Sequence, residues 1–407
     1  MSEDWKSFRL VPDDVLFFRD GKPNTRGSDH YLRSLFPPNP STLYGALRTR
    51  RLLDEGIDLA SLDESAWRRL PGALRQELGE WGGFGSLELR GPWLLRADEP
   101  MLPAPADLGL SLAERSPDRQ PRSKRRRGGL TAPSPPAVER VARFRSSSAS
   151  DGGHSHGCEL LRPYVHDGTR WEPWPSNRPE PRPATGWYLT AAGLHRWRRG
   201  QVPDPGDLIH RSELCADEMR TGLGLEAGDR RSEDHMLYTY GFVRMRVGVG
   251  LGFEVRGTRL TAGGRVRLGG EGRTCRLEAG RPFPAVTPET AASPDGCFRV
   301  ALATPALSEA GGYPPGFSPA TRLGSMGGRR LRLVGAVMGG FILAGGWDVA
   351  RGRAKPLRRA LPPGSVFLFE DREAGAAAAL DGINVSDFRS ESLALQGFGL
   401  VMAGAEP

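Results

Sequence analysis

The chain has little cysteine and no long apolar run, and each shortage excludes a class of protein. Its four cysteines never form the CxxC pair of a zinc ribbon or redox site. No run of about 18 apolar residues occurs, as a membrane-spanning helix would need. The first eight residues lack the basic-then-apolar order of a signal peptide. With 38% hydrophobic residues among 407, we expect a folded cytoplasmic protein of two or three ordinary domains, with four reduced thiols.

Motifs for metal binding and for common enzyme chemistry are also absent. The nearest approach to a metal-ligand cluster is His154, His156 and Cys158, in a Gly/Ser-rich stretch. A structural zinc site needs four ligands, so a mobile loop is the favoured interpretation of these three. There is no Walker loop, no GxSxG and no HExxH motif. We expect no metal and no cofactor.

Lysine is scarce too, so the net charge of +8 comes almost entirely from arginine. The only lysines are Lys6, Lys22, Lys124 and Lys355. Arginine forks suit phosphate and base edges, but a GC-rich genome would produce the same bias. Residues 116–145 contain nine basic residues against Asp118 and Glu139, which accounts for nearly the whole net charge. Any nucleic-acid site elsewhere must therefore be a local patch.

The pattern of apolar residues predicts a mixed α+β fold. Residues 7–19 read as a strand, and a helix begins at Asn39-Pro40 with the apolar stripe Leu43, Ala46, Leu47 and Leu53. Strand, loop and helix in this order begin a ferredoxin-like unit. Further helices are expected at 64–78 and 187–199, a strand at 85–96, a hairpin at 265–278, and strands at 297–303, 331–337, 341–344 and 365–370.

We therefore expect two ferredoxin-like (RRM-like) domains with antiparallel sheets and long loop insertions. The N-terminal domain would span residues 1–200, with a basic mobile insertion near 111–156 that has little to bury. The C-terminal domain would span residues 201–407 and carry Gly-rich loops.

The clearest strand is expected at residues 236–249. Its odd positions Val243, Met245, Val247 and Val249 would enter a core, and its even positions carry Tyr238, Tyr240, Phe242, Arg244 and Arg246. Rings combined with guanidinium groups on one sheet face can hold single-stranded RNA, and Arg244 and Arg246 are candidate contacts. The alternative is that the rings pack beneath another part of the protein.

Several segments are distinctive when they are taken together. DVLFFRDGKP at 14–23 and FPPNPSTLYGALR at 36–48 resemble the N-terminal signature of the Cmr-type RAMP subunit of type III-B CRISPR effectors. GGWD at 345–348, KPLRRA at 355–360 and PGSV at 363–366 resemble its C-terminal signature. Weaker matches are LPAPADL at 102–108, LYT at 237–239, GGEGR at 269–273 and ATPAL at 303–307. The matches occur in one order along most of the chain.

This resemblance implies the third subunit of the Cmr complex. Such a subunit binds the 5′ repeat-derived tag of the crRNA, docks on the large polymerase-like Cas subunit and contacts the repeated RAMP backbone subunit. It meets target RNA only indirectly, has no membrane partner, and leaves target cleavage to the backbone subunit. We therefore expect a non-catalytic scaffold for antiviral RNA-guided interference.

The N-terminal signature contains a candidate phosphate site. Unpaired amides at the start of a helix, with Ser41 and Thr42, would bind an anion. Arg19, Lys22 and Arg26 leave the preceding strand toward the same end. The alternative is that Ser41 and Thr42 only cap the helix. Arg48, in the same signature, is a further candidate RNA contact.

The C-terminal signature contains a dense basic loop beside glycines. Its cations are Arg351, Arg353, Lys355, Arg358 and Arg359. The resemblance implies guide-RNA contact here, whereas a charge run by itself is as well explained by a solvated face. For Trp347 we expect an indole plugging the core, and for Asp348 a carboxylate that fixes the turn.

Two other functions remain open. Some RAMP relatives cut RNA with a histidine as general acid or base. His30 lies among Arg26, Asp29, Tyr31 and Arg33, so a RAMP endoribonuclease that processes precursor crRNA is the main alternative. A general RNA-binding protein without partners is the second.

Overall fold

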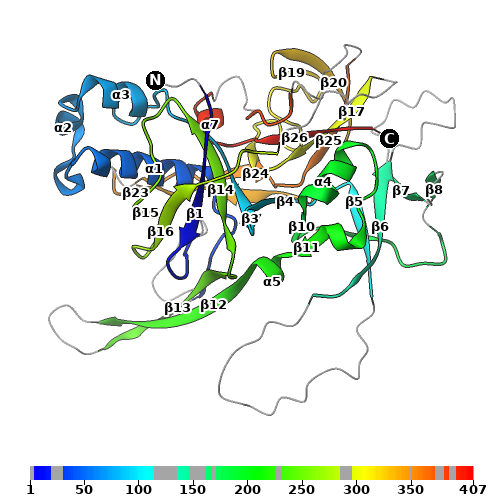
Figure 1. The fold of residues 1–407 in the computed structure, drawn as a ribbon, viewed down its shortest axis with the longest axis horizontal. Coiled ribbons are helices and arrows are strands. Elements are labelled where there is room, and N and C mark those ends of the chain that lie inside the picture. The colour runs from blue at the N-terminus through cyan, green and yellow to red at the C-terminus, as the bar shows by residue number, and fades with distance from the viewer. Residues whose placement is uncertain are drawn as a thin grey trace.

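Sheets dominate the computed structural model of the chain, and its helices are few and short (Figure 1). The described residues are 4–19, 31–113, 135–145, 162–166, 171–173, 175–225, 232–284, 296–348, 351–371, 380–384 and 391–406. Within them the strands pair antiparallel, except that β2 (Tyr31–Arg33) pairs in parallel with β13 (Ser232–Met245). The predicted α+β class with antiparallel sheets is confirmed. No described helix is both long and apolar enough to cross a membrane.

An eight-stranded antiparallel sheet is the largest element. Its spatial order is β11 (Leu208–His210), β10 (Trp187–Leu189), β4 (Glu99–Pro103), β3 (Glu88–Arg96), β14 (Val249–Arg256), β1 (Lys6–Pro12), β16 (Thr274–Ala279) and β15 (Arg265–Arg267). Leu10 lies between Leu251 and Leu277 on the two neighbouring strands. The strand predicted at 85–96 and the hairpin at 265–278 are confirmed as β3 and β15–β16.

Strand β1 is shorter than predicted, because the chain bends at Asp13 and leaves the sheet. The Asp13 carboxylate accepts hydrogen bonds from Arg265 (3.0 Å) and Thr274 (2.7 Å), which stabilise the bend. After it, Leu16 pairs with Val243 on another sheet. The predicted strand 7–19 is therefore divided between two sheets.

Helix α1 (Pro40–Asp54) begins at the predicted Asn39-Pro40 and packs onto the eight-stranded sheet. Leu43 and Leu47 are fully buried, as predicted. The predicted stripe is wrong at its end, since Leu53 is exposed. The next buried position of the helix, four residues after Leu47, is occupied by Arg51. Its guanidinium group forms an ion pair with the buried Glu77.

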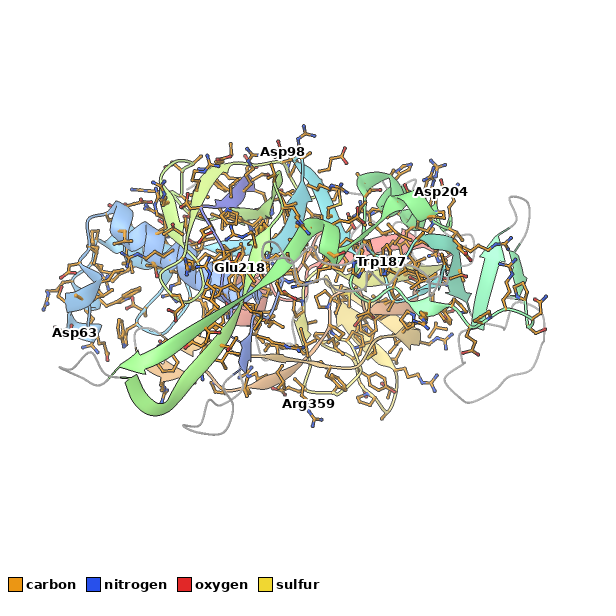
Figure 2. All side chains as sticks on the ribbon, turned by 90° about the horizontal axis from the view of Figure 1, so that it is seen from below. Asp63, Asp98, Trp187, Asp204, Glu218 and Arg359 are labelled. Carbon is orange, nitrogen blue, oxygen red and sulfur yellow. The ribbon has the colours of Figure 1, made fainter. Side chains whose placement is uncertain are left out.

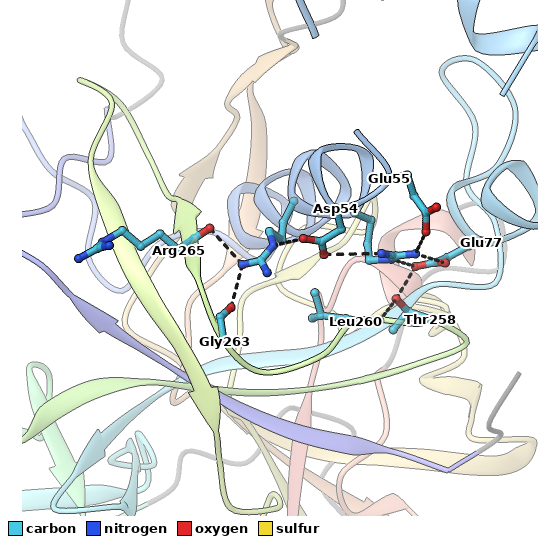
Figure 3. Close-up of polar contacts among 9 residues, drawn as sticks. Asp54, Glu55, Glu77, Thr258, Leu260, Gly263 and Arg265 are labelled. Carbon is cyan, nitrogen blue, oxygen red and sulfur yellow. Dashed lines mark hydrogen bonds and ion pairs between the residues drawn. The ribbon is translucent and has the colours of Figure 1, made fainter. Parts of the chain in front are cut away.

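Two neighbouring arginines attach α1 to the rest of the molecule (Figure 3). Arg50 Nη1 donates to the carbonyl of Gly263 at 3.0 Å. Arg51 Nε donates to the buried Glu77 carboxylate at 2.8 Å, and Thr258 donates to the same carboxylate. Burial is the largest single influence and lowers the pKa of Arg51, but the hydrogen bonds and charges of Glu77 and Glu55 together outweigh it, and the net shift is upward. Both guanidinium groups are thus engaged in packing.

The helix predicted at 64–78 is two helices, α2 (Glu64–Arg68) and α3 (Gly72–Leu78), after a short 3-10 turn, η1 (Leu59–Ser61). Pro71 stands at the N-cap of α3, where an N–H group would have no partner within the helix. The same proline prevents α2 from continuing into α3, because it cannot donate a hydrogen bond to the preceding turn. The buried Trp67 Nε1 donates to the Gly79 carbonyl at 3.1 Å and so links the two helices.

A five-stranded antiparallel sheet is formed by strands from the C-terminal part of the chain. Its order is β19 (Leu323–Met326), β20 (Arg329–Val337), β25 (Val366–Glu370), β17 (Cys297–Leu302) and β26 (Val401–Ala405). The strands predicted at 297–303, 331–337 and 365–370 are confirmed.

Helix α4 (Ala191–Arg198) packs Trp197 against Gly404 of β26. The predicted helix 187–199 is therefore correct only from Ala191, because Thr190 caps it and β10 precedes it. Other helical elements of the described residues are η3 (Pro205–Asp207), α5 (Arg211–Leu214) and α7 (Glu391–Leu395).

Two small sheets lie between these strands. One has the order β18 (Ala306–Leu307), β24 (Arg358–Leu361) and β21 (Ile342–Ala344); the other pairs β22 (Trp347–Asp348) with β23 (Arg353–Ala354). Strands β21 and β22 pair with β24 and β23, so residues 341–348 and 351–361 form one irregular hairpin, here named the C-terminal hairpin. The strand predicted at 341–344 is confirmed as β21.

A second five-stranded sheet includes part of the basic insertion. Its order is β8 (Trp171–Pro173), β7 (Arg162–His166), β6 (Val138–Arg145), β5 (Leu108–Leu112) and β9 (Arg182–Pro183). The prediction that 111–156 has little to bury is wrong for β6, where Val141 pairs with Leu110 and is buried. Residues 114–134 and 146–156 lie outside the described residues.

The long antiparallel ribbon of β12 (Cys215–Leu225) and β13 (Ser232–Met245) stands away from the body of the molecule in Figure 1. Strand β2 (Tyr31–Arg33) pairs with β13 in parallel. The strand predicted at 236–249 ends early, at Met245. Val247 is fully exposed in the turn before β14, where Gly248 has φ +78, so its predicted place in a core is wrong.

Asp107, directly before β5, is the centre of a buried ionic network. The carboxylate accepts hydrogen bonds from Arg143 of β6 (3.1 Å), Arg299 of β17 and Trp197 of α4 (3.0 Å). Arg299 also binds Glu406 at 2.8 Å. Burial, together with the charge of Arg299, lowers the pKa of Arg143 to about 10. Burial also opposes the charge of Arg299, but Glu406 and Asp107 outweigh it and the net pKa shift is upward. One carboxylate thus joins two sheets and a helix.

Replacement of Asp107 by alanine is expected to lower the free energy of unfolding by about 3–5 kcal/mol, because it leaves buried guanidinium groups without their common partner. Equilibrium denaturation in urea measures the change. The control is Glu64→Ala, which removes the partner of Arg68 from an exposed pair and should change the free energy by less than about 1 kcal/mol. Equal losses in the two variants would contradict the importance of the network.

Candidate nucleic-acid interface

Arg19 is the first of the predicted RNA contacts that the structure describes. It is exposed, and its backbone forms an isolated bridge with Ser34. Lys22 and Arg26 of the same loop, and the alternative catalyst His30, lie outside the described residues. Arg19 therefore marks one end of the loop, and the proposed contacts of Lys22 and Arg26 stay predictions.

Ser41 and Thr42 lie half-buried in the first turn of α1. The N-cap residue is Asn39, whose side chain makes no capping hydrogen bond, and Pro40 follows it. The Thr42 amide donates to the Asn39 carbonyl at 2.9 Å. Asn39, and not Ser41 or Thr42, therefore occupies the cap position. Among the described residues, no hydrogen bond from the side chain of Ser41 or Thr42 supports the alternative that they only cap the helix.

Arg48 lies two turns further along α1, inside an aromatic cage. Its guanidinium carbon is 5.5 Å from the ring centroid of Trp67 and 6.0 Å from those of Tyr44 and Phe84. Its Nη1 donates to the Gly83 carbonyl at 3.1 Å. Burial lowers the pKa of Arg48, which the attraction of Tyr44 and of Asp348 only partly offsets. The cage orients this cation and removes much of its hydration.

The C-terminal hairpin meets α1 at this cation. Asp348 of β22 attracts both Arg48 and Lys355 electrostatically. Burial lowers the pKa of Lys355, the charge of Asp348 raises it, and the charge of Arg48 lowers it again. Lys355 also donates its backbone N–H to the Gly346 carbonyl at 2.9 Å. The fold therefore brings together the N-terminal and C-terminal segments that the resemblance singled out.

Asp348 organises the turn of the hairpin. Its carboxylate accepts the backbone N–H of Arg351 at 3.2 Å and pairs with the Arg351 guanidinium at 2.8 Å. Partial burial raises the pKa of Asp348, but these contacts outweigh it and hold the pKa below its usual value. Arg351 in turn lies against Gly82, where any Cβ would collide with its guanidinium. The prediction that Asp348 fixes the turn is confirmed.

Trp347, in contrast, does not plug a core. Its side chain is 56% exposed, so the structural role predicted for this indole is wrong. Asp348 adjoins it in sequence, and successive side chains of a strand point to opposite faces. When the carboxylate turns toward Arg351 and the body of the protein, the indole is directed to solvent.

Three more cations of the hairpin are exposed: Arg353, Arg358 and Arg359. Arg358 lies opposite Ala344, and Arg359 lies opposite Leu343. Figure 2 labels Arg359, whose side chain projects outward from the ribbon. Within the described part of the chain these three guanidinium groups have no carboxylate partner, in contrast to Arg351. They are therefore free to neutralise an external anion.

The aromatic face predicted on β13 packs inside the protein. Tyr240 stacks on Phe17, with ring centroids 4.9 Å apart, and Phe242 lies 5.3 Å from the same ring. Arg220 and Arg273 cover Phe242 at 5.1 and 4.9 Å. This is the packing arrangement that the sequence left open as the alternative to an RNA platform. Tyr238 is outside the described side chains.

The two arginines predicted on that face differ in their surroundings. Arg244 pairs with Asp14 at 3.0 Å and with Glu218 at 2.5 Å. Partial burial raises the pKa of Asp14, but Arg244 and Arg220 lower it more, so the carboxylate stays charged. Arg246 is exposed and donates to the Ser212 carbonyl at 3.5 Å, with no carboxylate partner among the described residues. Arg246 is thus the freer of the two.

No alternative chemistry emerges from the described residues. They contain no group of three His, Cys, Asp or Glu side chains that could hold a metal, and residues 154–158 lie outside them. Cys215 and Cys275 are buried free thiols, as predicted, and burial raises their pKa values to about 11 and about 12. Neither is a thiolate at neutral pH.

One comparison with known proteins, a family model, agrees with the resemblance. A family model described as CRISPR-associated protein (Cas_Cmr3) matches residues 8–406. No curated protein matches the chain. Two similar solved chains come from cryo-EM structures of a type III-B Cmr-beta complex, one bound to cognate target RNA and AMPPnP and one bound to cognate target RNA. They are 13% and 14% identical, each with a TM-score of 0.46, covering 89% of this chain and 86% of the other.

Replacement of Asp348 by alanine is expected to speed hydrogen exchange at the Arg351 amide, which loses its acceptor. Global stability should change by less than about 1 kcal/mol, because the ion pair is partly exposed. Exchange measured by mass spectrometry on peptides from the C-terminal hairpin tests this. The control is Asp217→Ala on β12 of the ribbon. It breaks a similar pair with Arg211 of α5 and should leave hydrogen exchange in the C-terminal hairpin unchanged. Unaltered exchange at Arg351 would contradict the role of Asp348.

Proposed function

The chain belongs to the Cas_Cmr3 family, which confirms the predicted resemblance to the third subunit of the type III-B CRISPR effector; we propose that it binds the 5′ repeat-derived tag of the crRNA. It acts as a scaffold in this proposal and does not break bonds. The tag would lie along the C-terminal hairpin and the start of α1.

The junction between α1 and the C-terminal hairpin is the observation that carries this proposal. Asp348 lies near enough to Arg48 and Lys355 to attract both electrostatically. Charged groups of two signatures about 300 residues apart in sequence therefore act on one another. Around this junction the hairpin carries five cations and one carboxylate, and that carboxylate is already engaged with Arg351. A polyanion is the partner that such a surface favours.

The individual cations have different parts in this proposal. Arg353, Arg358 and Arg359 are exposed and would contact phosphates directly. Arg48 and Lys355 are more buried and would act mainly through their charge. Ser41 and Thr42, at the positive end of α1, would bind the terminal phosphate together with Arg19, Lys22 and Arg26. Arg246 would extend the contact toward the ribbon, while Arg244 is engaged with carboxylates.

We further propose that the chain contains two ferredoxin-like units. Strands β16, β1, β14 and β3 lie side by side in this spatial order. They are the fourth, first, third and second of the four in chain order, and α1 follows the first. Strands β17, β20, β25 and β26 have the same order, with α7 before the last. This order supports the ferredoxin-like topology, in which two βαβ halves interleave in one antiparallel sheet. The division into residues 1–200 and 201–407 stays a prediction, and β14 and β16 lie beyond residue 200.

The partners in this proposal follow from family membership alone. They are the crRNA, the large polymerase-like Cas subunit and the repeated RAMP backbone subunit, with target RNA contacted indirectly. A cytoplasmic location belongs to the same proposal. A RAMP endoribonuclease with His30 as acid or base is the alternative, and a general RNA-binding protein without partners is the second.

Charge reversal at Arg358 and Arg359 is expected to weaken binding of tag-bearing RNA. If both contact phosphates, their loss should also reduce the slope of log affinity against log salt by about 1.4. Fluorescence anisotropy over a range of salt concentrations measures both quantities. The matched control reverses the charges of Arg68 and Arg69 at the C-terminal end of α2. This changes the net charge by the same amount at another exposed site. Equal affinities for the hairpin variant and the wild type would count against the proposal.

A cleavage assay separates the scaffold from the ribonuclease. We expect the isolated chain to leave repeat-containing RNA intact, and His30→Ala to bind it as the wild type does. Gel electrophoresis of labelled RNA after incubation, with and without divalent cations, provides the measurement. Cleavage by the wild type that disappears in His30→Ala would overturn the scaffold and favour the alternative.

A further inference from the structure

The C-terminal hairpin exposes four large apolar side chains that its short sheets do not cover. Trp347 is 56% exposed, Phe341 49%, Leu343 44% and Leu357 42%. Isolated exposed apolar residues are ordinary, but four on one hairpin form a feature that needs a reason. The indole is the largest of them and is the one whose burial the sequence predicted. Its exposure follows from the fold, since Asp348 beside it is held by Arg351.

The surroundings of this apolar surface are basic. Arg359 is the direct cross-strand partner of Leu343. In the β22–β23 ladder Ala354 stands opposite Trp347, whereas Arg353 stands opposite Asp348 and so follows the face of that carboxylate. Arg358 lies opposite Ala344 and is exposed. Exposed apolar side chains and exposed arginines therefore occur together on one hairpin.

This combination of exposed rings and exposed cations fits a single-stranded nucleic acid better than a protein. Every base has a flat face that can stack on an indole, and a phosphate follows each base at regular spacing. A protein partner for an apolar patch would be expected to meet a surface depleted of charge at its centre, whereas here charged residues lie between the apolar ones. The alanine opposite Trp347 leaves the indole face without a bulky neighbour on the paired strand.

We infer that Trp347 is a stacking platform for one unpaired base of the guide RNA, with the exposed arginines of the hairpin holding nearby phosphates. This inference rests on the proposed function and adds to it a base-contacting residue. The hairpin would then position the RNA in register through stacking, while its arginines supply affinity that depends on salt. Phe341, further along the same hairpin, would meet a base at another position.

The test compares Trp347→Ala with the wild type in binding a fluorescent single-stranded RNA that begins with the repeat-derived tag. Loss of one stacked base should weaken affinity about 5- to 150-fold. The slope against salt should stay unchanged, because no phosphate contact is removed. Trp347→Phe, which keeps an aromatic face, should recover most of the loss. The full-length chain is used throughout, and its unfolding midpoint checks that each variant is folded.

A second measurement locates the base. Abasic sites are introduced one at a time along the tag, and each RNA is bound by the wild type and by Trp347→Ala. At one position the abasic RNA should weaken wild-type binding and leave Trp347→Ala unaffected, because the stack is already lost. Leu323→Ala is the matched control, since Leu323 is equally exposed but lies on β19, outside the hairpin.

The outcomes separate this inference from the proposed function. If the wild type shows no preference for tag-bearing RNA, the proposed function fails and the inference fails with it. If the wild type binds and Trp347→Ala binds equally well, only the inference is overturned. If Trp347→Ala keeps its RNA affinity but no longer co-purifies with companion subunits, the surface is a protein-docking site and the inference is likewise overturned.

Discussion

The architecture depends on one carboxylate that is removed from water. Asp107 neutralises Arg143 of β6 and Arg299 of β17, and it accepts the indole N–H of Trp197 in α4. A buried charge without a partner carries a large desolvation penalty. The folded state is therefore stable only when these elements assemble together around the carboxylate. The network thereby links the sheet that contains β5 and β6 to the five-stranded sheet that contains β17.

A second, weaker set of charges determines what the surface can bind. Asp348 lies between cations of α1 and of the C-terminal hairpin and engages Arg351 directly. The one carboxylate of the hairpin pairs with Arg351, and Arg353, Arg358 and Arg359 are exposed with no carboxylate partner among the described residues. Ion pairing and RNA binding are therefore alternatives for an arginine-rich chain. Arg244 and Arg51 illustrate the first, and Arg358 and Arg359 are the candidates for the second.

Much of the fold was predictable where the pattern is local. The start of α1 followed from Asn39-Pro40, and strands β17, β20, β21 and β25 followed from short apolar runs between turn residues. Errors arose where a distant partner decided the outcome. Val247 reads as an inward strand position, but a turn at Gly248 exposes it. Val141 lies in a charge-rich stretch, yet pairing with β5 buries it.

From the amino-acid order alone, the family, the α+β class and the two basic signature segments could be established, because these depend on residue types and short spacings. Tertiary structure alone decided that the two signatures adjoin, that Phe242 is covered by Arg220 and Arg273, and that the Trp347 indole faces solvent. The physical reason is that burial and ion pairing are properties of contacts between residues far apart in the chain. A tryptophan or an arginine has the same appearance in sequence whether its partner is present or absent.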